Sequence, residues 1–398
     1  MEQSYIYKRK HCPVCLTENM PQAISPHQDL KFPLLPVCVD TPKEQDVFAP
    51  FSIGICNNCG LIFLLEVADP AELYKIFHSD GIGKVWEEHY EKFSKLIFKH
   101  HPGTSRSDGH RLRYGASQQG KLLEIGSGQG KLMAKLLAHY QSGMEVIDPQ
   151  YEGPKENVVV HPTLLNFDFA KANPGKFDAI VSSHTLEHFI DFNEYFKDSW
   201  TALREGGMLF TSVPNQESNF AKGYGNQLNF EHPSICTNAH WIYLHYSNGF
   251  VIRELSFFKD HSVQIAAQKV AKPISFELDV KELSRAILSQ YEQSIQNRIN
   301  TIKQKATPDK QNWIFGASNF TQPLFVYGLD EKVFAGVMDN SPLKHGKRLY
   351  GTSLICRKPS EIVDGKNKLR VFLNIGQYNQ EVKEQLLALD PNVELIFL

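Results

Sequence analysis

Between Lys121 and about Ala271, short apolar runs bounded by turn residues alternate with helix-like patterns. Alternation of this kind is typical of a parallel sheet with helices on both faces. Five strands are therefore expected, at Leu122–Ile125, Met144–Ile147, Val158–His161, Ala179–Ser182 and Met208–Ser212.

A long amphipathic segment follows this unit. Its apolar residues recur at steps of three and four, which predicts one connecting helix of about 25 residues ending before Pro308. The stripe consists of Val280, Leu283, Ile287, Tyr291, Ile295, Ile299 and Ile302. A second alternating unit then begins, with strands expected at Trp313–Gly316, Phe334–Met338, Leu369–Asn374 and Val393–Phe397.

The first 70 or so residues have several prolines and little periodicity. A helical pattern runs from Pro70 to about His100, and the polar stretch Gly103–Gly115 is predicted to be a loop. With 398 residues the chain is long enough for two or three domains. We expect a small domain over residues 1–70, a larger α/β domain over 71–275, and a connecting helix with a second α/β domain over 276–398.

Composition places the chain among ordinary globular proteins. Hydrophobic residues make up 42% and charged residues 22%, and the formal net charge is −2. Near-neutrality argues against general nucleic-acid binding, which needs a basic face. No apolar run approaches the length of a membrane span, and the first residues lack a signal-peptide pattern. A cytoplasmic location is expected.

Four of the seven cysteines form two Cys-x-x-Cys pairs, Cys12 with Cys15 and Cys56 with Cys59. Two such pairs can supply four thiolates in a tetrahedron, which Zn²⁺ prefers, and four thiolates leave no open position for catalysis. A structural zinc site is therefore predicted, with Gly60 suiting the tight turn after the second pair. A thioredoxin-like redox motif is the alternative, but neither pair has its setting. Cys38, Cys236 and Cys356 are expected to be ordinary buried thiols.

A glycine-rich loop follows the first strand of the larger unit. Glu124-Ile-Gly126-Ser-Gly128-Gln-Gly130 opens a helix, and glycines there let the backbone pass close to a ligand. Asp148 is expected at the end of the next strand, where a carboxylate can accept from ribose hydroxyls. Asp168 is expected at the end of the following strand, facing an adenine amino group. Glu124 disfavours a pyrophosphate and suits a cationic ligand such as an aminoacyl sulfonium.

This loop, together with the segments after it, resembles class I S-adenosylmethionine (SAM)-dependent methyltransferases. The matching segments, in the order of that family, are EIGSGQG, Asp148, FDAIVSSHTLEH at residues 177–188, LREGGML at 203–209 and Val213-Pro214-Asn215. The resemblance implies SAM as the cofactor, held by Glu124, Gly126, Gly128, Asp148 and Asp168. A different nucleotide-binding α/β domain is the alternative.

Two histidines are expected at the carboxyl edge of the same sheet, where ligands bind in open α/β folds. His232 follows Glu231 in the segment after the fifth strand, and His188 follows the fourth strand. Imidazole is the usual general base near neutral pH, so His232, paired with Glu231, is the first candidate for that role and His188 the second polar group. Both could instead be packed or hydrogen-bonded structural residues.

The whole chain is similar to a narrower family, the sugar C-methyltransferases that act on nucleotide-linked keto-deoxysugars. That family has a four-cysteine zinc domain, a central SAM domain and a C-terminal Rossmann-like domain that helps to hold the sugar nucleotide. Its Tyr-x-Glu-His segment matches Asn229, Glu231 and His232 here, and its histidine after the fourth strand matches His188. Asn229 replaces the tyrosine of the family, which weakens the case for C-methylation but not for methyl transfer.

The C-terminal unit contains a second candidate binding site. Gly316-Ala-Ser318 is expected at a strand-to-helix turn, where backbone N–H groups suit phosphate. Asp339 and Asn340 are expected after the next strand, at a ribose-type position. With Asn229, these residues are the candidate substrate contacts. A degenerate unit kept for packing or dimerisation is the alternative.

These observations predict a methyltransferase acting on a nucleotide-activated sugar or related glycan precursor. The small-molecule substrate would lie between the central and C-terminal domains. An O- or N-methyltransferase on a glycan or small phosphorylated molecule, and a SAM-binding scaffold without catalysis, are the alternatives. Membrane and nucleic-acid partners are not expected.

Overall fold

The computed structural model describes residues 6–24, 27–73, 81, 83–101, 120–140 and 144–398. The predicted loop at 103–115 lies outside these residues. The helical pattern from Pro70 to His100 is described in part, as α1 (Pro70–Leu73) and α2 (Lys84–His100).

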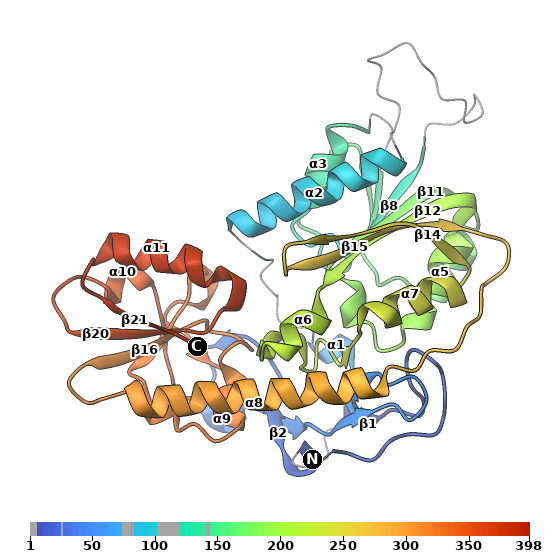
Figure 1. The fold of residues 1–398 in the computed structure, drawn as a ribbon. Coiled ribbons are helices and arrows are strands. Elements are labelled where there is room, and N and C mark those ends of the chain that lie inside the picture. The colour runs from blue at the N-terminus through green and yellow to red at the C-terminus, as the bar shows by residue number, and fades with distance from the viewer. Residues whose placement is uncertain (1–5, 25–26, 74–80, 82, 102–119, 141–143) are drawn as a thin grey trace.

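A seven-stranded sheet forms the centre of the chain. Its strands lie in the order β10-β9-β8-β11-β12-β15-β14 (Figure 1). The first five are parallel, and they confirm the five predicted strands: β8 (Leu122–Ile125), β9 (Met144–Ile147), β10 (Val158–His161), β11 (Phe177–Ser183) and β12 (Leu203–Pro214). The parallel sheet is therefore built as the apolar pattern predicted.

The last two strands form a hairpin that the apolar pattern did not reveal. β15 (Ser262–Lys269) runs antiparallel between β12 and β14 (Phe250–Phe258). Although β15 is almost entirely buried, its sequence SVQIAAQK carries buried polar residues such as Gln264. Because a buried strand is recognised by an apolar run, these polar residues hide it from sequence reasoning.

Helices cover both faces of this sheet, as Figure 1 shows. On one face α2 and α3 (Lys131–Leu137) share a core with β8, β9 and β12. On the other, α5 (Phe192–Ala202) and α7 (Asn238–Ser247) pack in a second core. The short helices are α4 (Phe167–Ala172) and α6 (Gln216–Ala221). This is the predicted mixed α/β architecture of the class I methyltransferase Rossmann-like fold.

The C-terminal unit is a second parallel sheet, in the order β19-β17-β16-β20-β21. Its strands are β16 (Gln311–Phe315), β17 (Gly336–Met338), β19 (Cys356–Arg357), β20 (Leu369–Leu373) and β21 (Glu394–Phe397). The helices of this unit are α9 (Gln322–Val326), α10 (Pro359–Ile362) and α11 (Asn379–Leu389). The order reverses direction between β16 and β20, which is where open α/β sheets form a crevice.

The predicted long helix is α8 (Lys281–Lys305), of 25 residues. It passes along both larger units and over the N-terminal segment (Figure 1). Most of the predicted stripe is buried, from Ile287 to Ile302, but Leu283 is 41% exposed and Leu288 is buried instead. The helix thus joins the three parts through one apolar face.

The N-terminal segment pairs with both larger units as well as with itself. β1 (Ile6–Lys8) pairs with β7 (Glu66–Ala68), and β2 (Lys31–Pro33) pairs with β4 (Phe48–Pro50). β5 (Ile53–Ile55) and β6 (Ile62–Leu64) are extended by β13 (Ser234–Ile235) of the central unit. β3 (Cys38–Val39) pairs with β18 (Arg348–Leu349) of the C-terminal unit. The segment therefore connects the two larger units.

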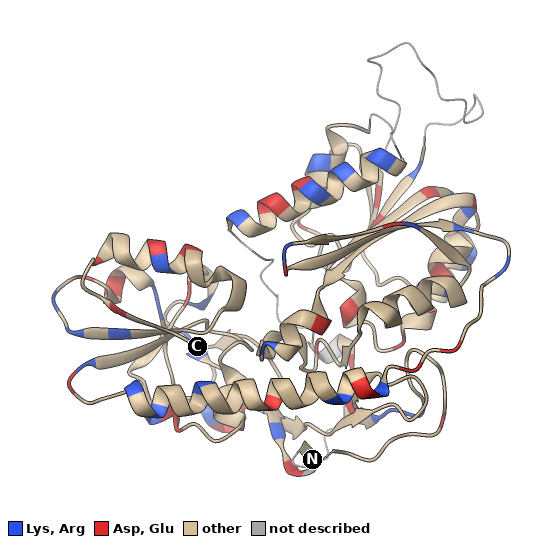
Figure 2. Cartoon of the chain, viewed as in Figure 1, with Lys and Arg blue, Asp and Glu red and all other residues tan. Residues whose placement is uncertain are grey.

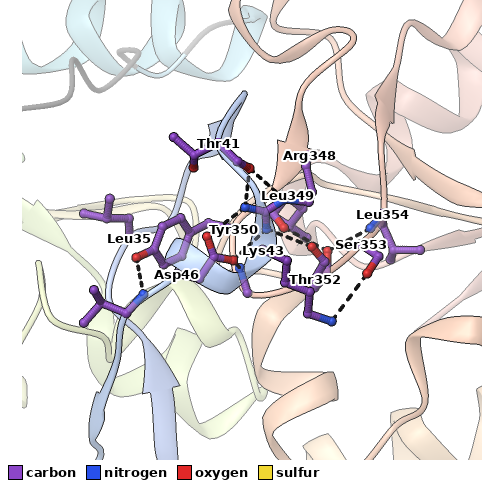
Figure 3. Close-up of polar contacts among 12 residues, drawn as sticks. Leu35, Thr41, Lys43, Asp46, Arg348, Leu349, Tyr350, Thr352, Ser353 and Leu354 are labelled. Carbon is purple, nitrogen blue, oxygen red and sulfur yellow. Dashed lines mark hydrogen bonds and ion pairs between the residues drawn. The ribbon is translucent and has the colours of Figure 1, made fainter.

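A buried ion pair accompanies the β3–β18 contact (Figure 3). Two nitrogens of the Arg348 guanidinium donate to the two carboxylate oxygens of Asp46, at 2.6 and 2.8 Å. Arg348 also donates to the carbonyls of Thr41 and Thr352, and Asp46 accepts from the Gly351 N–H. Each partner is thus satisfied although both lie away from water.

Charged residues of both signs are mixed along α2, α8 and α11 in the view of Figure 2. This agrees with the formal net charge of −2. Of the helices that the structure describes, none is long and apolar enough to cross a bilayer. Cys38, Cys236 and Cys356 are buried free thiols, as predicted.

Candidate functional site

A cavity of about 980 Å³ lies at the carboxyl edge of the central sheet. The glycine loop forms part of its wall, and so do His188, Glu231 and His232. The N-terminal segment contributes residues 7–11, and the C-terminal unit contributes Gln377 and Tyr378. All three parts of the chain therefore meet around one cavity.

The glycine loop has the backbone conformation that its sequence predicted. Gly126 and Gly128 have positive φ angles, of 69° and 54°. A Cβ atom on Gly126 would lie 2.4 Å from the Thr185 side chain, so a larger residue would collide with the turn after β11. Close packing as well as backbone conformation therefore requires glycine here.

Asp148 follows β9 and faces the loop, as predicted. Its two carboxylate oxygens accept from the backbone N–H groups of Gly128 and Gln150, each at 2.7 Å. These bonds fix the carboxylate at the cavity wall, where its remaining lone pairs can accept from ribose hydroxyls. Glu124 lies in β8, is 2% exposed and lines the same cavity. A buried carboxylate beside the glycine loop supplies a negative charge and acceptor oxygens, which suit a cationic cofactor.

Asp168 lies elsewhere than expected. β10 ends at His161, and Asp168 occupies the first turn of α4, with Asn166 as the N-cap. The prediction that Asp168 lies at the end of a strand is therefore wrong. The side chain is exposed, and Leu164 and Leu165 are the residues of this segment that line the cavity. The helix begins early because the Asn166 side chain accepts from the Phe169 N–H.

His232 and His188 meet in the cavity, as the sequence suggested. Their Nε2 atoms are 3.3 Å apart. His232 Nδ1 lies 2.8 Å from the backbone carbonyl of Asn226, which can only accept, so Nδ1 carries the hydrogen. This contact leaves Nε2, beside His188, as the nitrogen of His232 that can accept a proton.

Asn229 organises the segment that carries His232. Its side-chain oxygen accepts from the backbone N–H groups of Glu231 and His232, at 2.8 and 3.2 Å. Glu231 is 9% exposed and lines the cavity, whereas the Asn229 side chain turns back toward the carbonyl of Asn226. A short polar residue at this position thus shapes the turn.

Glu187, beside His188, has an unusual environment that the sequence did not reveal. It is 1% exposed, and burial raises the pKa of its carboxyl to about 7. One of its oxygens is 3.4 Å from His184 Nδ1. Within the described residues, Glu187, His188 and His232 bring a carboxyl and two imidazoles within 4.8 Å of one another.

The predicted contacts in the C-terminal unit form a local network. The carboxylate of Asp339 accepts from the N–H groups of Ala317 and Ser341 and from Lys344 Nζ, at 2.9–3.0 Å. Gly316 has a φ of 110° and packs against Ile375. Ser318 lies in the turn after β16, and Asn340 lines a separate cavity of about 430 Å³.

The C-terminal residues that do reach the large cavity were not anticipated. Tyr378 lines the cavity together with Trp86 of α2. Burial raises the pKa of Tyr378 to about 12. No pattern in the sequence marks Trp86, Gln377 or Tyr378, because their role depends on how the two units pack together.

The four predicted zinc ligands come together at the start of the chain. Cys12 Sγ is 3.7 Å from Cys59 Sγ, and Cys15 Sγ is 3.6 Å from Cys56 Sγ. Sulfurs bound tetrahedrally to Zn²⁺ at about 2.3 Å are about 3.8 Å apart, whereas disulfide sulfurs are about 2.0 Å apart. All four atoms lie within 4.8 Å of one another, so the cluster fits Zn²⁺.

In both cysteine turns, the residue after the second cysteine has a positive φ. The sequence indicated this only for the second turn, where the residue is glycine. Gly60, after Cys59, has a φ of 86°, and Leu16, after Cys15, has a φ of 59°. The glycine is needed because a Cβ atom there would lie 2.6 Å from the backbone nitrogen of Lys281, at the start of α8. The turn thus holds two cysteines of the cluster and is also the docking point of a helix.

Residues 100–268 match a family model described as a methyltransferase domain. No curated protein sequence matches the chain. Similar solved structures include a SAM-dependent methyltransferase from Mesorhizobium loti, with 14% identity over 37% of this chain and 90% of the other, at a TM-score of 0.32.

Two further similar structures have named activities. One is the N-methyltransferase NodS from Bradyrhizobium japonicum, with 14% identity over 46% of this chain and 96% of the other, at a TM-score of 0.32. The other is a geranyl diphosphate C-methyltransferase from Streptomyces coelicolor, with 15% identity over 49% of this chain and 90% of the other, at a TM-score of 0.34.

Proposed function

We propose that the chain transfers the methyl group of SAM to a nucleotide-activated sugar, at a carbon next to a keto group. The match of residues 100–268 to a methyltransferase-domain family model supports methyl transfer. SAM would lie against Glu124, Gly126, Gly128 and Asp148. The sugar would lie beside His188 and His232, with its nucleotide toward the C-terminal unit. Zn²⁺ bound by Cys12, Cys15, Cys56 and Cys59 would be structural.

One observation carries the proposal: His232 lines the same cavity as the glycine loop, and the contact of its Nδ1 with the Asn226 carbonyl leaves Nε2 to act as the base. In the proposed step His232 removes a proton from the sugar carbon. That carbon then attacks the sulfonium methyl, and the carbon–methyl bond forms as the sulfur–methyl bond breaks. His232 ends protonated, and S-adenosylhomocysteine leaves. A cavity of this volume is at the upper end of the usual range of about 300–1,000 Å³, which suits two ligands side by side.

The test is a methyl-transfer assay on the full chain with a panel of nucleotide keto-deoxysugars. We expect His232→Ala to abolish turnover, a loss of at least about 100-fold, while SAM binding measured by calorimetry stays within about twofold. The control is His139→Ala, at an exposed histidine after α3, which should leave both unchanged. Unchanged turnover in His232→Ala would remove His232 from the mechanism.

O-methylation is the second candidate, and Asn229 favours it. Methylation at carbon needs a group that stabilises the enolate, and Asn229 stands where the resembling family has a tyrosine. A sugar hydroxyl needs only the base. Solvent deuterium appearing at the sugar carbon in the absence of SAM would identify C-methylation. Methyl transfer without such exchange, giving an acid-stable ether, would identify O-methylation.

A further inference from the structure

Three histidines from separate parts of the chain converge beside the cavity. His89 comes from α2, His184 from the turn after β11, and His261 from the residue before β15. Each offers a ring nitrogen, and the three nitrogens lie within 4.8 Å of one another. We propose that His89, His184 and His261 bind a divalent transition-metal ion at the wall of the cavity, separately from the cysteine cluster.

The ring nitrogens face a common centre. His184 Nε2 is 2.8 Å and His89 Nδ1 is 3.3 Å from the hydroxyl of Ser262, which His261 Nδ1 also contacts. Gln264 Nε2 approaches His89 Nδ1 at 3.4 Å. Imidazole nitrogens bind Zn²⁺, Cu²⁺, Ni²⁺ and Fe²⁺. The Ser262 hydroxyl has one hydrogen and can donate it to only one of the three ring nitrogens at a time, whereas a metal ion at this centre would bind all three.

The outward-facing nitrogens of two of these rings have partners typical of metal ligands. His184 Nδ1 faces the carboxyl of Glu187 at 3.4 Å, and His89 Nε2 faces the hydroxyl of Ser183 at 3.1 Å. Ligating histidines usually donate their second N–H to such a group, which leaves the other nitrogen free to bind the metal. The outer contacts therefore direct His184 Nε2 and His89 Nδ1 toward the centre.

The backbone and the surroundings hold the cluster in place. His184 has a φ of 51°, a left-handed conformation that is uncommon outside glycine and clusters at functional sites. The Trp86 ring covers all three imidazoles, with centroids 4.5–5.6 Å away. His89 and His261 are at most 2% exposed. The rings are thus held in place by their surroundings, and two of the three are almost wholly buried.

Three protein ligands leave a fourth position, as in metal sites that act on substrates. His184 and His261 line the large cavity, whereas His89 lies behind them. This part of the inference rests on the proposed function: an ion here would bind an oxygen of the methyl-accepting sugar, on the side opposite His232. Binding of the ion does not depend on that role, so it can be tested without substrate.

The experiment titrates Co²⁺ into the full chain after its cysteine cluster has been loaded with Zn²⁺. We expect one further equivalent, with visible ligand-field bands and without the intense sulfur charge-transfer band of a thiolate site. His89→Gln and His261→Gln should each weaken this binding at least about 100-fold, since each removes one of three ligands. His245→Gln, at a buried histidine outside the cluster, should retain it.

Two outcomes would overturn the proposal: no further Co²⁺ in the wild type, and unchanged binding in His89→Gln. In the second case, loss of binding in His232→Ala would place the ion at Glu187, His188 and His232. Retained zinc and a native circular-dichroism spectrum check that the variants fold. If a variant does not fold, wild-type NMR decides, because bound Co²⁺ should shift the three clustered histidine signals and not that of His245. Co²⁺ uptake without methyl transfer to sugars would leave this inference standing and remove the proposed function.

Discussion

At the scale of single residues, position decides what a side chain does. Asp148 and Asp168 have the same chemistry, but one is held at the cavity by two backbone N–H groups and the other is exposed on α4. Similarly, His232 lines the cavity, where its Nε2 lies 3.3 Å from His188 Nε2, whereas His245 is wholly buried. Two predictions follow from these contrasts.

The first contrast predicts unequal effects on cofactor binding. In Asp148→Asn, the amide must place its NH₂ group against the N–H of Gly128 or Gln150, because both carboxylate oxygens accept from backbone. We expect SAM affinity to fall at least about tenfold, or about 1.4 kcal/mol. The matched variant Asp168→Asn should change it less than about twofold. Isothermal titration calorimetry with SAM measures both, and an equal loss in the two variants would contradict the geometry.

The second contrast predicts a loss of stability in acid. Burial lowers the pKa of His245 to about 4. The unfolded state, with a pKa near 6.5, binds the proton first as pH falls, so the contribution of His245 to stability is complete above pH 6.5 and is lost toward pH 4. Between pH 7.5 and 5.0 the free energy of unfolding should fall by about 2 kcal/mol from this residue.

His245→Gln removes that titration. Denaturant unfolding of wild type and variant at both pH values isolates it, because the difference between the two proteins should shrink at pH 5.0. A difference that does not depend on pH would mean that His245 has the same pKa folded and unfolded, so that its contact with the Trp241 carbonyl offsets the effect of burial.

At the scale of elements, short segments join units that are far apart in sequence. The N–H of Val280, just before α8, donates to the carbonyl of Cys59 at 3.1 Å, so the long helix starts on the cysteine cluster. β13 completes the β5–β6 sheet, and β18 pairs with β3. Contacts of this kind make the start of α8 sensitive to the turn beneath it.

Gly60 tests this junction. In Gly60→Ala the new methyl group would lie 2.6 Å from the Lys281 backbone nitrogen, in addition to the cost of a positive φ. The control Gly328→Ala has a φ of 96° and open space around it, so it carries the φ cost alone, about 1–2 kcal/mol. We expect Gly60→Ala to lose a further 1–3 kcal/mol, roughly the cost of overpacking. If denaturant unfolding shows the same loss of free energy in both variants, the start of α8 can shift to make room for the added methyl group.

At the scale of the whole molecule, three parts of the chain share one interior. A single apolar core includes residues of the N-terminal segment, α6, α8 and the C-terminal sheet. The cysteine cluster belongs to another core, which it shares with the central sheet. The large cavity lies where the parts meet, so the geometry of the site depends on how the parts are held together.

The Arg348–Asp46 pair is one of these connections (Figure 3). Arg348→Met leaves the Asp46 carboxylate, whose side chain is 0% exposed, without its ion partner. Removing one member of a buried pair costs about 3–5 kcal/mol. The adjacent Lys347→Met breaks only a partly exposed pair with Asp40 at 3.9 Å and should cost less than about 1 kcal/mol. Thermal unfolding of both variants compares them, and similar losses would show that the interface does not depend on Arg348.

What the sequence determined by itself is local. The parallel strands, α8, the glycine loop with Asp148 and the two cysteine pairs were all recognisable, because periodicity, glycine spacing and ligand spacing act over a few residues or one strand–helix unit. Two local features were still missed. The buried polar residues of β15 concealed that strand, and the helix cap at Asn166 places Asp168 in a helix instead of at a strand end.

Only the tertiary structure decided which distant residues meet. Trp86 and Tyr378 line one cavity from two units, and His89, His184 and His261 form one cluster from three elements. Such encounters depend on the packing of whole layers against one another. The side chains involved carry no local pattern, because each is an isolated residue in its own segment. Sequence patterns therefore predicted the glycine loop and the cysteine cluster, while the shape of the large cavity came from the assembly of the three parts.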